Sequence, residues 1–426
     1  MRAVLIYPRI FLLIASMVCL GADALAEELN FSGQARGLWS EQNAQANSPS
    51  SVAELLLPGL IPASKSLGVL ETELHLSGHG INAIATAQGQ LNTTDQARST
   101  HATAWLNELY GTVGEGAWQL SAGRKVVAWD VGYGFRPNDV VQQEKRRNLI
   151  GNTLVGRSLA TLDYFDANLA ATLVWINPER VFKGNERESK WSDEQAFAAR
   201  IYYRAGGADL HGFVKYGDQS GASVGAAVAW VATDALELHA SARYLLRGIV
   251  KQMAPNVSLL QRSSPWLAQT QTDIAQVLLG ATWTNEQQHS FLLEAWWDGT
   301  ALSPKQWRQW SSRNSSLIAS APKLTQYQHE LAYNLAWQSQ VLAEGSSLQQ
   351  QNLFARWSWQ RSTWQPALDI LWTPQDGGRV TTASLGWQGD RWHLDGGVRV
   401  YGGSNAAVLA QLPSRRTAYV SAIWTF

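Results

Sequence analysis

The last eleven residues, 416–426, constrain the fold of this chain more than any other stretch. Side chains alternate between the two faces of a β-strand, and this stretch alternates between apolar and polar residues. One face carries Ala418, Val420, Ala422, Trp424 and Phe426, and the other carries Thr417, Tyr419, Ser421, Ile423 and Thr425. Only Ile423 breaks the pattern, so the stretch predicts a strand with one apolar and one mostly polar face.

The same alternation recurs along most of the chain, with short turns predicted at 78–80, 114–116, 166–168 and 206–208. This pattern predicts an all-β fold, a closed antiparallel transmembrane β-barrel with long loops on the extracellular side. We expect about 18 strands. The alternatives are 16 and 20, because bacterial single-chain barrels have even numbers of strands. The segment 326–338 reads either as one strand or as part of an extracellular loop or hairpin, and 52–58 predicts a short helix.

The aromatic end of the final strand resembles the closing strand of bacterial outer-membrane barrels. In that class the last residue is typically Phe and is recognised by the assembly machinery. The resemblance implies that Trp424 and Phe426 form an assembly signal. It also implies outer-membrane lipids, lipopolysaccharide and the assembly machinery as partners.

The N-terminus predicts export through a cleaved signal peptide, residues 1–26. Arg2 and Arg9 flank an apolar run, and Ala24-Leu25-Ala26 offers a small-residue cleavage site. The rest, 27–426, reads as a single barrel domain. The only cysteine of the whole chain, Cys19, lies in the predicted signal peptide, so the predicted domain 27–426 has none. No later segment has eighteen consecutive apolar residues, as a membrane-spanning helix would need.

Composition supports a membrane position. Tryptophan occurs 21 times, and its ring prefers the membrane–water boundary. We expect boundary girdles from tryptophans near strand ends, namely Trp39, Trp105, Trp118, Trp175, Trp283 and Trp424. The chain has 34 basic and 34 acidic residues, which argues against a nucleic-acid partner.

An 18-stranded barrel is wide enough for an aqueous lumen. Alternation points strand charges of both signs into it: Arg36, Arg200, Arg204, Lys215, Arg243, Arg247, Arg356 and Arg399, with Glu71, Glu73, Glu108, Asp163, Glu237, Glu294, Asp298, Asp369 and Asp395. These charges either pair across strands or form a transverse field that orients polar or zwitterionic solutes. They do not form the strongly basic wall of an anion-selective pore.

The most distinctive local sequence joins the strand 106–110 to the stretch 123–139. It resembles the signature of large porin-like outer-membrane proteins, including the alginate-export type, in a strand followed by a loop that folds into the pore. The matching positions are Asn107, Glu108, Tyr110, Gly123, Arg124 and Trp129. By alternation, Arg124 falls on the same strand face as the lipid-facing residues. We therefore expect a bulge beside Gly123 to turn its side chain inward.

The loop after this motif, 130–152, is rich in charge: Asp130, Arg136, Asp139, Glu144, Lys145, Arg146 and Arg147. It is either a solvated external loop or an inserted constriction. We expect the second arrangement, with Arg136, Lys145, Arg146 and Arg147 facing acids of the opposite wall. Replacing Lys145, Arg146 and Arg147 by Gln would then shift ion preference towards cations.

The leading interpretation is an outer-membrane channel, porin-like, that passes small polar solutes or an exported polysaccharide by passive diffusion. The eight histidines are scattered singly, and no nucleophile, phosphate-loop or metal-spacing motif is present. We therefore expect no catalysis, cofactor or metal. The alternatives are a non-conducting structural or surface-binding barrel and an outer-membrane lipid hydrolase.

Overall fold

The strands form one closed antiparallel sheet. The computed structural model describes residues 29–94, 97–142, 154–176, 194–343 and 345–426, and its sheet contains 18 strands. Each strand pairs with its sequence neighbours, and β1 also pairs with β18. The predicted 18-stranded barrel is therefore confirmed, whereas the predicted signal peptide lies outside the described residues.

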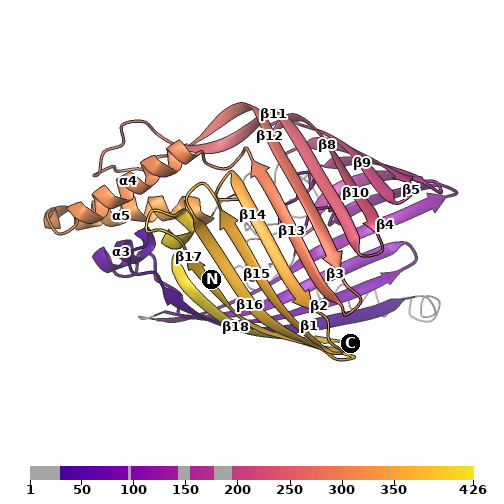
Figure 1. Ribbon diagram of the computed structural model, residues 1–426, viewed down its shortest axis with the longest axis horizontal. Coiled ribbons are helices and arrows are strands. Elements are labelled where there is room, and N and C mark those ends of the chain that lie inside the picture. The colour runs from indigo at the N-terminus through magenta and orange to yellow at the C-terminus, as the bar shows by residue number, and fades with distance from the viewer. Residues whose placement is uncertain (1–28, 95–96, 143–153, 177–193, 344) are drawn as a thin grey trace, which may run out of the picture.

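The strands run up and down the wall of the barrel, as Figure 1 shows. Their bounds are β1 Asn30–Ala44, β2 Ser66–Gly78, β3 Ile81–Thr93, β4 Arg98–Glu115, β5 Trp118–Lys125, β6 Arg157–Phe165, β7 Leu169–Ile176, β8 Ala196–Ala205, β9 Ala208–Gly217, β10 Gly221–Thr233, β11 Leu236–Met253, β12 Trp266–Thr284, β13 His289–Asp298, β14 Gln351–Trp359, β15 Trp364–Thr373, β16 Gly378–Gln388, β17 Trp392–Gly402 and β18 Ser414–Thr425. The four short turns fall where the alternation predicts them. They lie at what we call the short-turn end, and the longer connections lie at the long-loop end.

Three α-helices of the described part of the chain gather at the long-loop end (Figure 1). They are α3 Pro49–Leu56, α4 Pro304–Ser320 and α5 Gln328–Gln340, with 3-10 turns η2 Thr325–Tyr327, η3 Val341–Ala343 and η4 Val408–Gln411. Ala53, Leu317 and Leu331, one from each α-helix, are fully buried in a shared apolar cluster. The short helix predicted at 52–58 is thus present as α3.

The interpretation of 326–338 as a strand is wrong, because this segment forms most of α5. Leu331 and Leu335 are four residues apart and both fully buried. Their spacing follows the helical period of 3.6 residues, which places them on one face against α3 and α4. Among the described residues, no helix is long and apolar enough to cross a membrane.

The outward face of the barrel is apolar and exposed, while the inward face is mainly polar. Leu120, Leu173, Leu279 and Leu293 are examples of large outward side chains in contact with the surroundings. Soluble proteins rarely expose contiguous apolar patches above a few hundred Å². The outward band therefore matches lipid rather than water.

Five of the six girdle tryptophans are exposed on the outward face, namely Trp39, Trp118, Trp175, Trp283 and Trp424. The prediction for Trp105 is wrong. Its register partner is Thr86, which is buried on the inward face next to Glu73. A register shift at Asn107 changes the parity of β4 and turns Trp105 inward.

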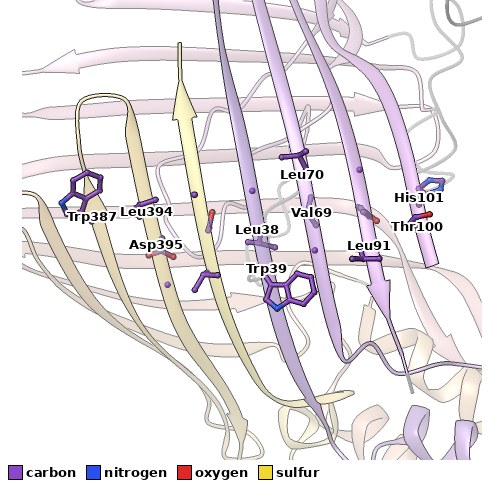
Figure 2. A pocket seen from close by; sticks show the side chains of 18 of the residues that line it. Leu38, Trp39, Val69, Leu70, Leu91, Thr100, His101, Trp387, Leu394 and Asp395 are labelled. Atoms are coloured by element: carbon purple, nitrogen blue, oxygen red, sulfur yellow. The ribbon is translucent and has the colours of Figure 1, made fainter. Parts of the chain in front are cut away.

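A shallow apolar hollow of about 980 Å³ lies over the outward face of β1–β4 and β15–β18. Figure 2 shows Trp39, Leu70 and Leu394 among the side chains that line it. Its lining is overwhelmingly apolar. The hollow belongs to the outward surface of the barrel and is not part of the lumen.

The barrel closes where the C-terminal residue meets β1. The backbone N–H of Gly33 donates to the carbonyl of Phe426 at 2.9 Å, and the N–H of Phe426 donates back at 3.0 Å. The Phe426 ring lies directly over Gly33, and a Cβ at Gly33 would sit 2.6 Å from ring atom Cζ. The ring also packs on Trp424, with centroids 4.8 Å apart. A side chain at position 33 would therefore displace the Phe426 ring and crowd the carbonyl of Glu73, which a Cβ would approach to 2.8 Å.

We predict that Gly33→Val impairs closure, because overpacking of this kind costs about 1–3 kcal/mol. Gly37→Val is the matched control, because a Cβ at Gly37 meets no atom within 4 Å on the same face of the same strand. The measurement is the yield of heat-modifiable folded barrel in membrane fractions. Equal yields from the two variants would contradict the prediction.

We also predict that replacing Phe426 by Asp impairs assembly far more than replacing Thr425. Phe426 contributes both the expected assembly signal and the ring that covers Gly33, whereas the side-chain hydroxyl of Thr425 makes only a long hydrogen bond, 3.4 Å, to the carbonyl of Arg391. The same gel-mobility assay measures the outcome. Similar amounts of folded barrel from both variants would remove Phe426 from this role.

Candidate functional site: a segment folded into the barrel

The interior is dominated by one segment that leaves the end of β5 and turns into the barrel. We call residues 126–142 the inserted segment. Its buried apolar residues pack on the inward side chains of β6–β10. The residues of this cluster are Val127, Trp129, Val140 and Val141 from the segment, with Leu159, Val174, Ile176, Ala196, Ala198, Phe213 and Ala227 from the wall. The described part of the predicted loop, residues 130–142, therefore lies inside the wall as expected, whereas 143–152 lie outside the described residues.

A polar cluster holds the middle of the inserted segment to β10 and β11. Asn138 donates from Nδ2 to Ser241 Oγ at 2.9 Å and to the carbonyl of Ala242 at 3.0 Å. Ser241 Oγ in turn donates to Asp130 Oδ2 at 2.9 Å. The backbone N–H of Asn138 also donates to this carboxylate oxygen. These hydrogen bonds satisfy the Asn138 amide nitrogen, the Ser241 hydroxyl and the Asp130 carboxylate, whereas Asn138 Oδ1 is buried without a hydrogen-bond partner among the described residues.

Glu294 on β13 fixes the tip of the inserted segment. Its carboxylate accepts from the backbone N–H groups of Tyr133 and Gly134, each at 2.6 Å. His239 Nε2 lies 3.0 Å from the same carboxylate. Glu294 is 0% exposed, so the predicted lumen-facing acid is in fact covered by the segment that it binds. A buried carboxylate with several donors forms strong charge-assisted hydrogen bonds.

Arg136 does not face acids of the opposite wall, and that expectation is wrong. Its Nε lies 3.0 Å from Asp139 Oδ2 within the same segment, and its Nη2 donates to the carbonyl of Asp130. Asp139 Oδ1 accepts from the N–H groups of Trp129 and Asp130, at 2.7 and 2.9 Å. These short-range bonds maintain the compact turn of the segment before it meets the wall.

Burial raises the pKa of Asp130 and of Asp139 above the ordinary value. For Asp130 the hydrogen bond from Ser241 counteracts burial most, and for Asp139 the Arg136 charge does so. Desolvation disfavours the charged carboxylate, whereas donors and a nearby cation favour it. Arg136 and Ser241 thus reduce the electrostatic cost of burying two acids close together.

The tip of the inserted segment reaches β14 through Tyr133. The Tyr133 ring stacks on Phe354 with centroids 5.7 Å apart, and Arg356 Nη1 donates to the Tyr133 hydroxyl at 3.2 Å. The same Arg356 nitrogen contacts both carboxylate oxygens of Asp369, at 3.0 and 3.1 Å. The structure thus brings together Arg356 and Asp369, two predicted site residues on adjacent strands.

The opposite part of the barrel wall, β1–β4, carries a polar network made of two groups. Glu73 accepts from Gln34 at 3.1 Å and from Asn107 at 3.2 Å, and it lies 2.6 Å from His75 Nε2. A second group centres on Glu71, which pairs with Arg36 at 2.9 Å and accepts from Gln88 at 2.7 Å. Both acids therefore have partners on neighbouring strands, as expected for charges that pair across a wet wall.

The other predicted basic residues occupy different settings. Arg243 anchors the inserted segment, since its Nη1 donates to the carbonyl of Pro137 at 3.2 Å. Arg200 donates to His211 Nδ1 at 3.2 Å on the inner face of β8 and β9. Arg204 is exposed near the short-turn end and is 3.9 Å from Asp209, too long for a strong ion pair.

The bulge expected beside Gly123 lies elsewhere. The pairing of β5 with β4 and β6 continues through Arg124 without a shift, and the irregularity is at Asn107 on β4. Gly123 nevertheless has a φ of 136° and approaches Leu109 so closely that a Cβ would lie 2.2 Å from its carbonyl oxygen. Arg124 Nε is closed off from solvent. Glu108 accepts from the N–H of Val126 at 2.7 Å, which fixes the start of the inserted segment.

Four predicted site residues, Glu144, Lys145, Arg146 and Arg147, lie outside the described residues. Their position at a constriction stays a prediction.

Sequence reasoning missed the docking surface of the inserted segment. The interior partners Ser241, Trp296 and Phe354 were not identified as functional residues. A signal was present in β7, where LAATLVWI is apolar on both faces except at Thr172. A strand with one face in lipid and the other in water should alternate, so a continuous apolar run indicates that something covers the inner face.

Together the geometry defines a transmembrane-type β-barrel with a segment folded into its lumen. Among solved structures, the chain is similar to that of Acinetobacter baumannii OccAB1, with a TM-score of 0.55 and 9% identity over 95% of this chain and 99% of that one. It also matches a mutant Rh. blastica porin, with a TM-score of 0.41 and 11% identity over 93% of this chain and 100% of that one. The first similarity supports the porin-like barrel fold.

No protein-family model matches the chain, and no curated protein sequence matches it. The resemblance to the alginate-export type is therefore not confirmed.

We predict that Glu294→Ala loosens the inserted segment, because the N–H groups of Tyr133 and Gly134 lose their shared acceptor. An unsatisfied buried donor costs about 1–3 kcal/mol. Chymotrypsin should then cut the folded barrel at Phe135, which is buried in the parent. The mass of the fragments gives the cleavage site.

Glu237→Ala is the control, because Glu237 is an exposed acid on β11. Glu294→Gln should give intermediate cleavage, since one acceptor oxygen remains. Equal protection of Glu294→Ala and the parent would show that the apolar contacts alone hold the segment.

Proposed function

We propose that this protein is an outer-membrane channel that passes small polar solutes by passive diffusion. The inserted segment narrows its lumen. The observation that supports this proposal best is the position of residues 126–142, which line the inner face of β6–β14 and leave the polar network of β1–β4 on the other side of the ring. The solutes pass between these two surfaces.

The outer face supports the membrane location. Its exposed apolar side chains and tryptophan girdles match a lipid bilayer, and closure leaves no unpaired strand edge in lipid. The outer membrane of a bacterium is the membrane in which barrels of this kind reside. This location agrees with the signal peptide predicted from residues 1–26.

The lumen charges support weak ion selectivity. Arg36 pairs with Glu71, Lys215 pairs with Glu194 at 2.9 Å, and Arg356 pairs with Asp369. Pairs of this kind reduce the net field that an ion meets, because each charge is neutralised by its neighbour. A channel lined in this way discriminates by size and hydrogen bonding more than by the sign of charge.

The test is planar-bilayer conductance. Replacing residues 130–139 by an equal-length Gly/Ser sequence removes Asp130, Arg136 and Asp139 together with the anchors to Ser241 and Glu294. We expect a higher single-channel conductance than the parent, with a cation-to-anion permeability ratio near unity in both. An equal-length replacement of 254–263, which packs on α4 through Arg313, is the control.

A parent protein that inserts as a folded barrel but carries no current would overturn the channel proposal in favour of a structural or surface-binding barrel. A current that is unchanged in the 130–139 variant would place the narrowest part elsewhere.

A further inference from the structure

The tip of the inserted segment presents an aromatic ring to the lumen. The Tyr133 side chain is 43% exposed, although its neighbour Phe135 is buried and stacks on Trp296. The Tyr133 backbone is fixed by Glu294, and its ring stacks on Phe354 and lies 5.8 Å from the Arg356 guanidinium carbon. A rigid, half-exposed ring inside a water-filled barrel is available to a passing solute.

Polar groups continue from this ring along one row of the wall. In the register of β14–β17, Arg356 is opposite Asp369, Asp369 is opposite Thr382, and Thr382 is opposite Arg399. Arg399 Nε donates to Thr382 Oγ1 at 2.9 Å. Adjacent strands are about 4.8 Å apart, so the row extends for about 14 Å. We call Tyr133 and this row the tip track.

The charges of the tip track neutralise one another. Arg356 and Asp369 form an ion pair whose side chains are 26% and 18% exposed, so both remain in reach of solvent. Arg399 and Asp395 lie close enough to interact electrostatically with Asp369. With the neighbouring Asp395 counted, the two arginines and two aspartates at the track carry no net charge. A monovalent ion would therefore have to compete with an existing ion pair.

We infer that the tip track is a subsite for neutral, hydroxyl-rich solutes, that is, sugars. The inference rests on the proposed channel function and specifies its solute class. A sugar can place the C–H face of its ring on the exposed face of Tyr133. Its hydroxyl groups can donate to Asp369 and accept from Arg356 or Arg399 without separating the pair.

Ions of either sign gain less from this arrangement. An anion would need a basic side chain that lacks a carboxylate neighbour. A cation would need a carboxylate that lacks a basic neighbour. A zwitterion could bridge the pair but has no apolar ring face for Tyr133. The combination of an aromatic face with a neutralised Arg–Asp pair therefore favours the sugar over the charged solutes.

Liposome swelling tests the solute class with three probes of similar size: glucose, gluconate as the anion and glucosamine as the cation. Glycine serves as the zwitterion. We expect the parent to admit glucose faster than gluconate and glucosamine, and maltotriose to interrupt the current in bilayers. Equal rates for glucose, gluconate and glucosamine, with no interruption by maltotriose, would overturn the inference. So would a rate for glycine, relative to its size, above that for glucose.

Variants locate the subsite. Tyr133→Leu keeps the bulk but removes the aromatic face, and should shorten the maltotriose interruptions about threefold to tenfold. Tyr133→Phe keeps the ring and should stay close to the parent. The double variant Arg356→Gln with Asp369→Asn removes both charges together, and should also shorten the interruptions.

Tyr202→Leu is the matched control, because Tyr202 is an inward tyrosine on β8 whose hydroxyl donates to Asp209. Each variant is checked for heat-modifiable folding and for KCl conductance. Interruptions of parental length in Tyr133→Leu would overturn the assignment of the subsite. Failure of the parent to conduct KCl would instead contradict the channel function itself.

Discussion

Closure of the sheet between β1 and β18 is the constraint on which the rest of the structure depends. A barrel in lipid has no water to satisfy its backbone groups, so every strand edge must find a partner within the sheet. Here the last residue completes the ring through its backbone bonds to Gly33, and its aromatic side chain covers that glycine. The absence of a side chain at Gly33 thus lets the aromatic C-terminus pack on β1, at the end of a β1–β18 pairing that runs from Gln34 to Ala44.

The closed cylinder creates a second requirement, because a ring of 18 strands encloses more space than its own side chains fill. The chain occupies part of that space with residues 126–142. Apolar contacts to β6–β10 provide the bulk of the docking surface, while Glu294 and the Asp130–Asn138–Ser241 cluster fix its orientation. The polar contacts set the orientation of the inserted segment, and burial of its apolar side chains stabilises its docking, as in the core of a soluble domain.

The helices at the long-loop end form a further compact unit. Arg313 of α4 donates to the carbonyls of Val257 and Ser258 and to Asn334 of α5, so one buried guanidinium links the β11–β12 connection to the two helices of the β13–β14 connection. Desolvation lowers the pKa of Arg313 from its ordinary value. These hydrogen bonds hold the β11–β12 connection against α4 and α5. This arrangement gives the long-loop end a defined shape beside the lumen.

The sequence by itself determined the barrel, its 18 strands, the short turns and the outward tryptophans, because all of these follow from a local period of two residues. Local pattern also predicted that charges such as Arg356 and Asp369 point inward. It failed at Trp105, where one extra residue at Asn107 reverses the parity, and at α5, where a mixed pattern concealed a helical period. Only the tertiary structure decided that Glu294 is covered, that Arg136 pairs with Asp139, and that Tyr133 meets Arg356. These contacts join residues up to 223 positions apart, and no local period specifies which distant strand a loop will meet.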